Sequence, residues 1–286
     1  MTSATAAVPS GIDAVDSAWL TDALRSDPTI PDDATVTAVM AEQIAQDSGF
    51  SSLLYRLHLT GSPGLPATVI AKLAAQSQAR GAMELLGGYR RELAFYRDIA
   101  GRAPMDAPHV YAARMADDSA DFVLVLEDLR EWDNADHLAG LSLERARLCI
   151  GQLAGLHAWS VQASTTAALQ VFPRFDMPAV RDLLVPAFEP GWDIYRTHSA
   201  VPVPEPVARF AARFTEHAAT ALAGLTRAVH AATWRHYRLA AGFLMLLPVI
   251  ILIGWGALPQ RSRDLCLTLT DRAVATIADI NAVEVF

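Results

Sequence analysis

Short apolar segments separated by polar turns dominate the first 130 residues, and their spacing predicts an antiparallel sheet. In residues 52–60, polar and apolar side chains alternate with the period of two expected for a strand with one buried face. A Gly-Ser-Pro-Gly sequence at residues 61–64 marks the turn that follows. The pattern predicts strands over residues 36–41, 52–60, 67–73, 110–115 and 122–126.

Two helices are expected within this half. Residues 12–26 predict a short amphipathic helix that lies on the sheet, because apolar side chains recur in them at helical spacing. Residues 81–100 predict a longer helix between the third and fourth strands. The apolar positions are Val15, Trp19, Leu20 and Leu24 in the first helix, and Tyr89, Leu93, Phe95 and Tyr96 in the second.

The second half of the chain has a helical pattern. Residues 142–158 predict a helix that Ser142 can cap, and residues 205–232 predict a long alanine-rich helix after a stretch punctuated by prolines. The expected buried positions of the first of these helices are Leu148, Leu153 and Leu156.

Residues 239–258 contain no charged side chain in twenty positions, and two structures are compatible with this segment. The β-branched residues between Val249 and Ile253, with Pro248 before them, favour a strand in a buried hairpin. Twenty apolar residues are also enough for a membrane-spanning helix. Arginines flank the segment on both sides and therefore do not indicate an orientation across a membrane.

Composition narrows the possible functions. The net charge is −8 and the chain has no dense Lys/Arg cluster, which argues against binding to nucleic acid. Cys149 and Cys266 lack the spacing of a zinc site or a disulfide framework, which favours a reducing, cytoplasmic environment. Residues 1–11 lack the basic and apolar regions of a signal peptide.

A lysine and a glutamate occupy positions that matter in kinase folds. Such folds hold the nucleotide phosphates with a lysine on the third strand, which a glutamate on the following helix fixes in place. Lys72 lies in the third predicted strand, and Glu92 lies in the next helix. The apolar fifth strand then runs into residues 127–129, where kinases have a hinge whose backbone binds adenine.

With these residues, the chain resembles the aminoglycoside phosphotransferase and choline-kinase-like superfamily, in particular its ecdysteroid-kinase-like bacterial branch. The resemblance covers roughly residues 36–160 and includes PATVIAKL, YRRELAFYRDIA and DFVLVLEDL. It implies an α+β, protein-kinase-like fold of two lobes. The first, over residues 1–129, would be a small antiparallel-sheet lobe that binds nucleotide. The second, over residues 130–286, would be mainly helical and shorter than is usual in the family.

The resemblance also implies ATP and Mg²⁺ as cofactors and a small molecule with a hydroxyl group as acceptor. Ala45 stands where the family has a glycine of the phosphate-binding loop. The nucleotide-binding positions that the resemblance implies are Ser48, Gly49, Lys72, Glu92, Glu127 and Leu129.

The catalytic and metal-binding positions depart from the family pattern. His236 stands for the catalytic aspartate, Ala241 for the metal-binding asparagine and Gly254 for the metal-binding aspartate. No shift in alignment restores them, because the chain has no carboxylate between Glu216 and Asp264. The sequence therefore predicts a kinase-fold protein that is impaired or inactive in phosphoryl transfer.

Two alternatives remain open at this stage. The chain could be an active small-molecule kinase that uses another base, or a membrane-associated protein with a helix at residues 239–258. A shortened helical lobe would also leave apolar surface uncovered, which predicts self-association.

Overall fold

The computed structural model shows a mixed α/β protein whose chain divides into two compact units, Met1–Phe172 and Pro173–Phe286. It describes residues 7–45, 52–75, 78–85, 87–117, 119–132, 135–136, 139–160, 185–214 and 246–279, with residues 162, 169–170, 172, 182 and 218 between them. The predicted α+β class agrees with this architecture, which is compatible with a kinase-like fold. The division into lobes at residues 129 and 130 stays a prediction.

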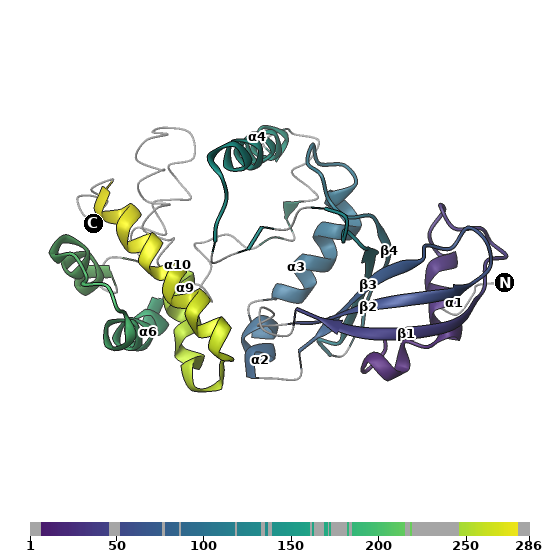
Figure 1. Ribbon diagram of the computed structural model, residues 1–286, viewed down its shortest axis with the longest axis horizontal. Helices are drawn as coiled ribbons and strands as arrows, with labels where there is room; N and C mark the ends of the chain where they lie inside the picture. Colours follow the sequence, from purple (N-terminus) through teal and green to yellow (C-terminus); the bar gives the residue numbers. More distant parts are fainter. Residues whose placement is uncertain are drawn as a thin grey trace. The chain divides into compact units, whose positions relative to one another are not determined.

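A five-stranded antiparallel sheet forms the centre of the first unit, with the strand order β1-β2-β3-β5-β4 (Figure 1). All five strands that the sequence predicts for the first 130 residues are present, with boundaries that differ by at most a few residues. The strands are β1 (Val36–Ile44), β2 (Ser52–Gly61), β3 (Thr68–Ala74), β4 (Val110–Met115) and β5 (Phe122–Glu127).

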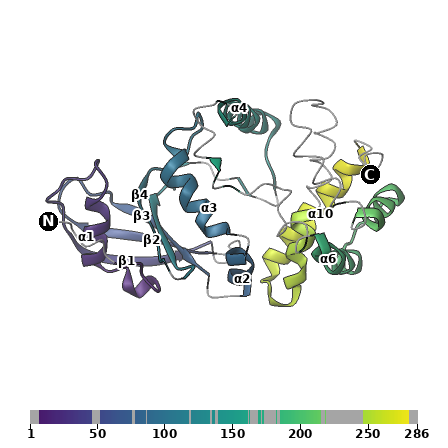
Figure 2. The ribbon, with the colours of Figure 1, turned by 180° about the vertical axis from the view of Figure 1, so that it is seen from behind.

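One face of this sheet packs against α1 (Ser17–Arg25) and the other against α3 (Gly88–Ala94), as Figures 1 and 2 show from two sides. The four apolar positions predicted for the N-terminal helix are all buried, but the helix is shorter than predicted: residues Ile12–Ala14 form a separate 3₁₀ turn, η1, and Val15 precedes α1. The α1 face includes Leu57, Ala71 and Val125, whereas the α3 face includes Leu124. Because side chains alternate along a strand, Lys72 lies on the α3 face.

The predicted single helix over residues 81–100 is wrong in one respect, because the chain breaks it. The structure has α2 (Gln78–Leu85), then α3, which continues into a π-helical turn, η2 (Phe95–Ala100). Gly87 precedes α3 with φ of 64°, in the left-handed region that glycine adopts without strain. Of the four expected apolar positions, Tyr89 and Leu93 are buried, whereas Phe95 and Tyr96 are only partly buried.

Helix α4 (Leu143–Ser160) begins where expected, and the Ser142 hydroxyl accepts a hydrogen bond from the Arg145 amide at 3.3 Å. Its predicted burial is wrong: Leu148 is 67% exposed, Leu153 is 49% exposed, and Leu156 is only partly buried. Apolar side chains occur around much of this helix, and the described elements cover little of its surface. Helix α4 belongs to the first unit.

The second unit consists of packed helices. Aromatic side chains of α6 (Val185–His198) form its centre together with Phe210 and Phe214 from helical residues 205–214. The Phe188 and Phe214 rings lie 4.5 Å apart. The other elements of this unit are α9 (Leu246–Ile251), η4 (Leu252–Ala257) and α10 (Gln260–Asp279).

The strand expected over Val249–Ile253 is wrong, because these residues belong to α9 and the 3₁₀ helix η4. Val249 is fully buried and approaches Gly191 of α6, so tertiary packing overrides the strand preference of the β-branched residues. Residues 239–245, the expected other arm of the hairpin, lie outside the described residues. Within the described part of the chain, no helix is both long enough and apolar enough to cross a membrane.

Candidate functional site

The Lys72 ammonium donates a hydrogen bond to Oε1 of Glu92, which joins β3 to α3 within the first unit. Both side chains are partly buried, with 21% and 24% of their surface exposed. The sequence reasoning paired these two residues, and the structure places them in contact. This ion pair fixes the position of the Lys72 ammonium on the α3 face of the sheet.

The sheet around Lys72 presents apolar side chains beside this charge. In the strand register, Leu54 of β2 lies opposite Lys72, and Arg56 lies opposite Ile70 of β3. All four residues therefore belong to the same face of the sheet. A lysine next to branched apolar side chains suits a ligand with an anionic end and a flat, less polar end.

The backbone at Ala45, where β1 ends, has φ of 53°. This left-handed conformation favours glycine over any residue with a Cβ. Ala45 is the position at which the resemblance implies a glycine of the phosphate-binding loop, and its backbone has a conformation that glycine adopts without strain. Ser48 and Gly49, the two loop residues predicted to bind phosphate, lie outside the described residues.

The hinge segment (residues 127–129) follows β5 and is held by side chains. The Asp128 carboxylate is 4% exposed and accepts hydrogen bonds from Arg56 through Nε at 2.8 Å and Nη2 at 3.3 Å. Arg130 donates to the same carboxylate at 2.8 and 3.0 Å. Burial opposes ionisation, but the hydrogen bonds from Arg56, Thr68 and Arg130 outweigh it and hold the pKa of Asp128 well below its ordinary value.

Glu127 and Leu129 flank this carboxylate in the hinge segment. The Glu127 amide donates to the His109 carbonyl at 2.8 Å, and its carboxylate accepts from the His109 amide at 3.0 Å. The Leu129 carbonyl accepts a hydrogen bond from the Trp132 amide at 2.9 Å. Glu127 and Leu129 were predicted to bind adenine through their backbone groups, and that role stays a prediction.

The catalytic half of the expected site is represented by one described residue. Gly254 lies in η4 and has no side chain to ligate a metal, whereas His236 and Ala241 lie outside the described residues. Among the described residues, no three His, Cys, Asp or Glu side chains are grouped as a metal site would require. Neither alanine nor glycine provides a side-chain oxygen, so Ala241 and Gly254 do not suit Mg²⁺ at the family positions.

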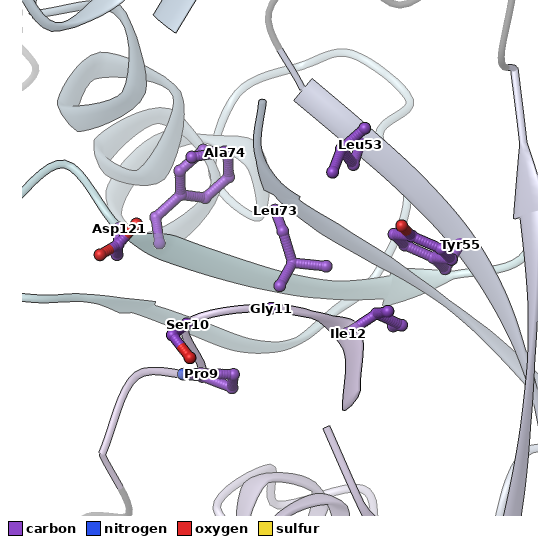
Figure 3. Close-up of a pocket in the computed structure, with 10 residues that line it drawn as sticks. Pro9, Ser10, Gly11, Ile12, Leu53, Tyr55, Leu73, Ala74 and Asp121 are labelled. Atoms are coloured by element: carbon purple, nitrogen blue, oxygen red, sulfur yellow. The ribbon is translucent and has the colours of Figure 1, made fainter. Parts of the chain in front are cut away.

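A small pocket of about 260 Å³ lies on the opposite, α1 face of the sheet. Figure 3 shows Pro9 and Ile12 of the N-terminal segment facing Tyr55 and Leu73 of the strands. Leu73 points to the α1 face and Lys72 to the other, so this pocket is separate from the Lys72 site.

Sequence reasoning missed two features of the site. The Arg56–Asp128 ion pair joins residues 72 positions apart, and neither was singled out. The second feature was visible in the sequence: Lys72 is the only lysine in the chain, beside 22 arginines. Arginine cannot replace lysine where a compact ammonium is needed. A lone lysine in an arginine-rich chain therefore indicates a site of chemical interest.

Comparison with known families agrees with this geometry. Residues 46–182 match the family model of the ecdysteroid kinase-like family. The match covers just under half of the chain and includes Lys72, Glu92 and the hinge segment, but ends before the positions of His236, Ala241 and Gly254. No curated protein matches the chain. The match to this family model supports a kinase-like superfamily for the chain.

Proposed function

We propose that this protein binds a nucleoside triphosphate in its first unit and does not transfer the phosphoryl group by the aspartate–asparagine route of kinases. Lys72 holds the phosphates, and the backbone of the hinge segment contacts the base. The observation that carries the proposal is the Lys72–Glu92 ion pair on the α3 face of the sheet. The family match implies a kinase-like phosphotransferase and supports the same placement of the nucleotide.

The physical basis is the position of one compact cation. An ammonium beside a glutamate keeps its side chain extended and directed, so it can contact phosphate oxygens without a large loss of conformational entropy. Arg56 and Arg80 are also near the sheet, but each is bound to two carboxylates, whereas Lys72 is bound to Glu92. Lys72 therefore combines a fixed position with a ligand-accessible charge.

Phosphoryl transfer needs more than this lysine. An aspartate must orient the acceptor hydroxyl, and oxygen ligands must hold Mg²⁺ against the developing charge. The corresponding positions are His236, Ala241 and Gly254, and no carboxylate occurs between Glu216 and Asp264. A nucleotide-binding protein without efficient transfer accounts for the presence of the first set of residues and the absence of the second.

The single lysine permits a direct test of binding. An ATP derivative with an acyl group on the γ-phosphate transfers that group to an amine held near the phosphates and releases ATP. Apart from the terminal amine, Lys72 is the only primary amine in the chain. We expect peptide mass spectrometry to find acylation at Lys72, and we expect excess ATP to suppress it.

A control amine can be placed on η2, the helical turn that continues α3. The variant Arg97→Lys places a second amine on η2 at a position whose side chain is 64% exposed. Acylation at position 97 should be slow and insensitive to ATP, while acylation at Lys72 stays ATP-sensitive. Equal labelling at both positions, unaffected by ATP, would contradict nucleotide binding at Lys72.

The family match also favours a second candidate, an active small-molecule kinase that uses another base. A sensitive ATP-turnover assay with and without Mg²⁺ separates the two. The proposal predicts no magnesium-dependent product above background. Product that depends on Mg²⁺ and disappears in Lys72→Ala would establish the second candidate.

A further inference from the structure

The hinge segment is held on two sides by polar contacts that reach across the first unit. On one side, Arg56 of β2 and Arg130 both bind the Asp128 carboxylate. On the other, His109 exchanges two hydrogen bonds with Glu127, one with the backbone and one with the side chain. The His109 ring in turn lies 2.9 Å from Asp27 after α1. These ion pairs and hydrogen bonds together fix the backbone orientation of the hinge segment.

Arg56 provides the connection between the hinge segment and the face that carries Lys72. It lies opposite Ile70 in the strand register, two residues along β2 from the partner of Lys72. Its guanidinium binds both oxygens of Asp128, and Nη1 lies 3.8 Å from Glu42 of β1. A bidentate arginine–carboxylate pair fixes orientation as well as distance. The backbone of residues 127–129 is thereby aligned relative to β2 and β3.

We propose that Arg56 and Asp128 are positioning residues, which orient the hinge backbone so that it discriminates between nucleotide bases. This inference rests on the proposed nucleotide binding and adds a division of roles to it. Lys72 determines affinity for the triphosphate, whereas the Arg56–Asp128 pair determines affinity for the adenine ring. Backbone amides and carbonyls distinguish adenine from guanine only when their direction is fixed, because the two rings present different donors and acceptors.

The test measures three ligands with the full chain: ATP, GTP and inorganic tripolyphosphate, which has the phosphates without a base. We expect the wild-type protein to prefer ATP over GTP. In Asp128→Asn, we expect ATP affinity to fall by about tenfold, the effect of one well-placed hydrogen bond, and the preference for ATP over GTP to narrow. Tripolyphosphate affinity should remain within about twofold of wild type, because Lys72 is untouched.

A matched control is available in the same unit. Arg80 is as exposed as Arg56, at 22% against 21%, and bridges two carboxylates, Glu84 and Asp121. It does not contact the hinge segment, so Arg80→Met should leave both the ATP affinity and the ATP-to-GTP ratio at the wild-type value. If Arg56 and Asp128 had a merely structural role, their substitution would lower the affinity for all three ligands together and leave the ratio of ATP to GTP affinity unchanged.

The outcomes separate the two levels of the proposal. If the wild-type chain binds neither ATP nor tripolyphosphate, nucleotide binding is wrong and the positioning role falls with it. If it binds both and Asp128→Asn keeps the wild-type ratio of ATP to GTP affinity, only the positioning role is overturned. If Asp128→Asn fails to fold, Arg56→Lys decides, since it keeps the charge but loses the bidentate geometry. Loss of base selectivity in that variant supports the inference, and an unchanged ratio overturns it.

Discussion

The two units of this protein are stabilised in different ways. In the first, ion pairs join residues distant in sequence across the sheet, as Arg56–Asp128, Lys72–Glu92 and Arg114–Asp22 do. In the second, buried aromatic rings and a close helix crossing at Gly191 provide most of the described packing. Partly buried ion pairs cost desolvation energy and give orientation in return. The first unit is therefore the one in which side-chain orientation matters for a ligand.

The largest effect is expected at the helix crossing of the second unit. A Cβ added at Gly191 would lie 1.9 Å from the Val249 carbonyl oxygen, a backbone atom that cannot rotate away. Gly191→Ala should destabilise the second unit by about 3 kcal/mol, because α6 and α9 must separate. The reactivity of the Cys266 thiol measures this, since burial raises its pKa to about 11 in the folded protein and keeps it unreactive.

The matched control for this variant is Gly256→Ala in η4, where an added Cβ meets no atom within 4 Å. Its Cys266 thiol should react as slowly as in the wild type. Cys149, exposed in the first unit, should react rapidly in all forms and provides the reference rate. Equal Cys266 reactivity in the two glycine variants would contradict the close crossing.

In the first unit, the largest expected effect on stability is that of Asp128. At neutral pH, Asp128→Asn removes the charge that two arginines share and should cost about 2 kcal/mol, measured by hydrogen exchange of the β2 and β3 amides. The pKa of Asp128 in the folded state is depressed below its ordinary value of 3.8, so its contribution is present above that pH. It is lost as the pH falls towards the lower folded-state pKa.

The difference in the free energy of unfolding between the wild type and Asp128→Asn should therefore decrease as the pH falls. Asp193→Asn is the control, since its pair with Arg196 is exposed on α6 and should contribute less than about 0.5 kcal/mol. A difference for Asp128→Asn that stays constant down to pH 2 would show that the carboxylate charge is not the stabilising feature.

The same contrast explains what could be predicted from the sequence. All five strands were found because alternation and turn residues are local signals, and the α1 residues were found because one apolar stripe defines the helix. The Lys72–Glu92 pair was found because a kinase-like order of elements brings these positions together. The Gly87–Gly88 dipeptide is a local signal for an interrupted helix, but the prediction did not use it, because apolar positions continue on both sides.

Features that depend on distant partners were missed. Val249 and its neighbours have strand propensity, and only their packing against Gly191 makes them helical. Likewise, Arg56 and Asp128 look like ordinary strand and turn residues until the sheet brings them within 2.8 Å. Burial of Leu148 and Leu153 was predicted from helical spacing alone, which does not specify what covers a helix.

The aromatic packing of the second unit includes one buried hydroxyl. Tyr195 of α6 donates a hydrogen bond to Asp271 of α10, and burial together with this carboxylate raises the pKa of Tyr195 to about 12. Tyr195→Phe should cost about 1.5 kcal/mol at neutral pH, measured by urea unfolding followed through Cys266 reactivity.

The pH dependence of this effect has the opposite sign to that of Asp128. The folded state holds the Tyr195 proton more tightly than the unfolded state, so the stabilisation is complete below pH 10 and declines as the pH rises towards 12. Between pH 10 and pH 12, the stability of the wild type should therefore fall towards that of Tyr195→Phe. An advantage that persists unchanged at pH 12 would contradict the raised pKa.

The smallest effect is expected at Ala45, where the first unit retains a glycine-like backbone without a glycine. Its φ of 53° strains a residue that has a Cβ, and Ala45→Gly relieves this strain while adding freedom to the unfolded chain. The net gain should be about 0.5 kcal/mol, measured by hydrogen exchange of β1 and β2. Ala41→Gly, in extended conformation within β1, should instead destabilise by about 0.5 kcal/mol. Opposite signs at two alanines four residues apart would confirm the left-handed backbone at Ala45, whereas equal destabilisation would contradict it.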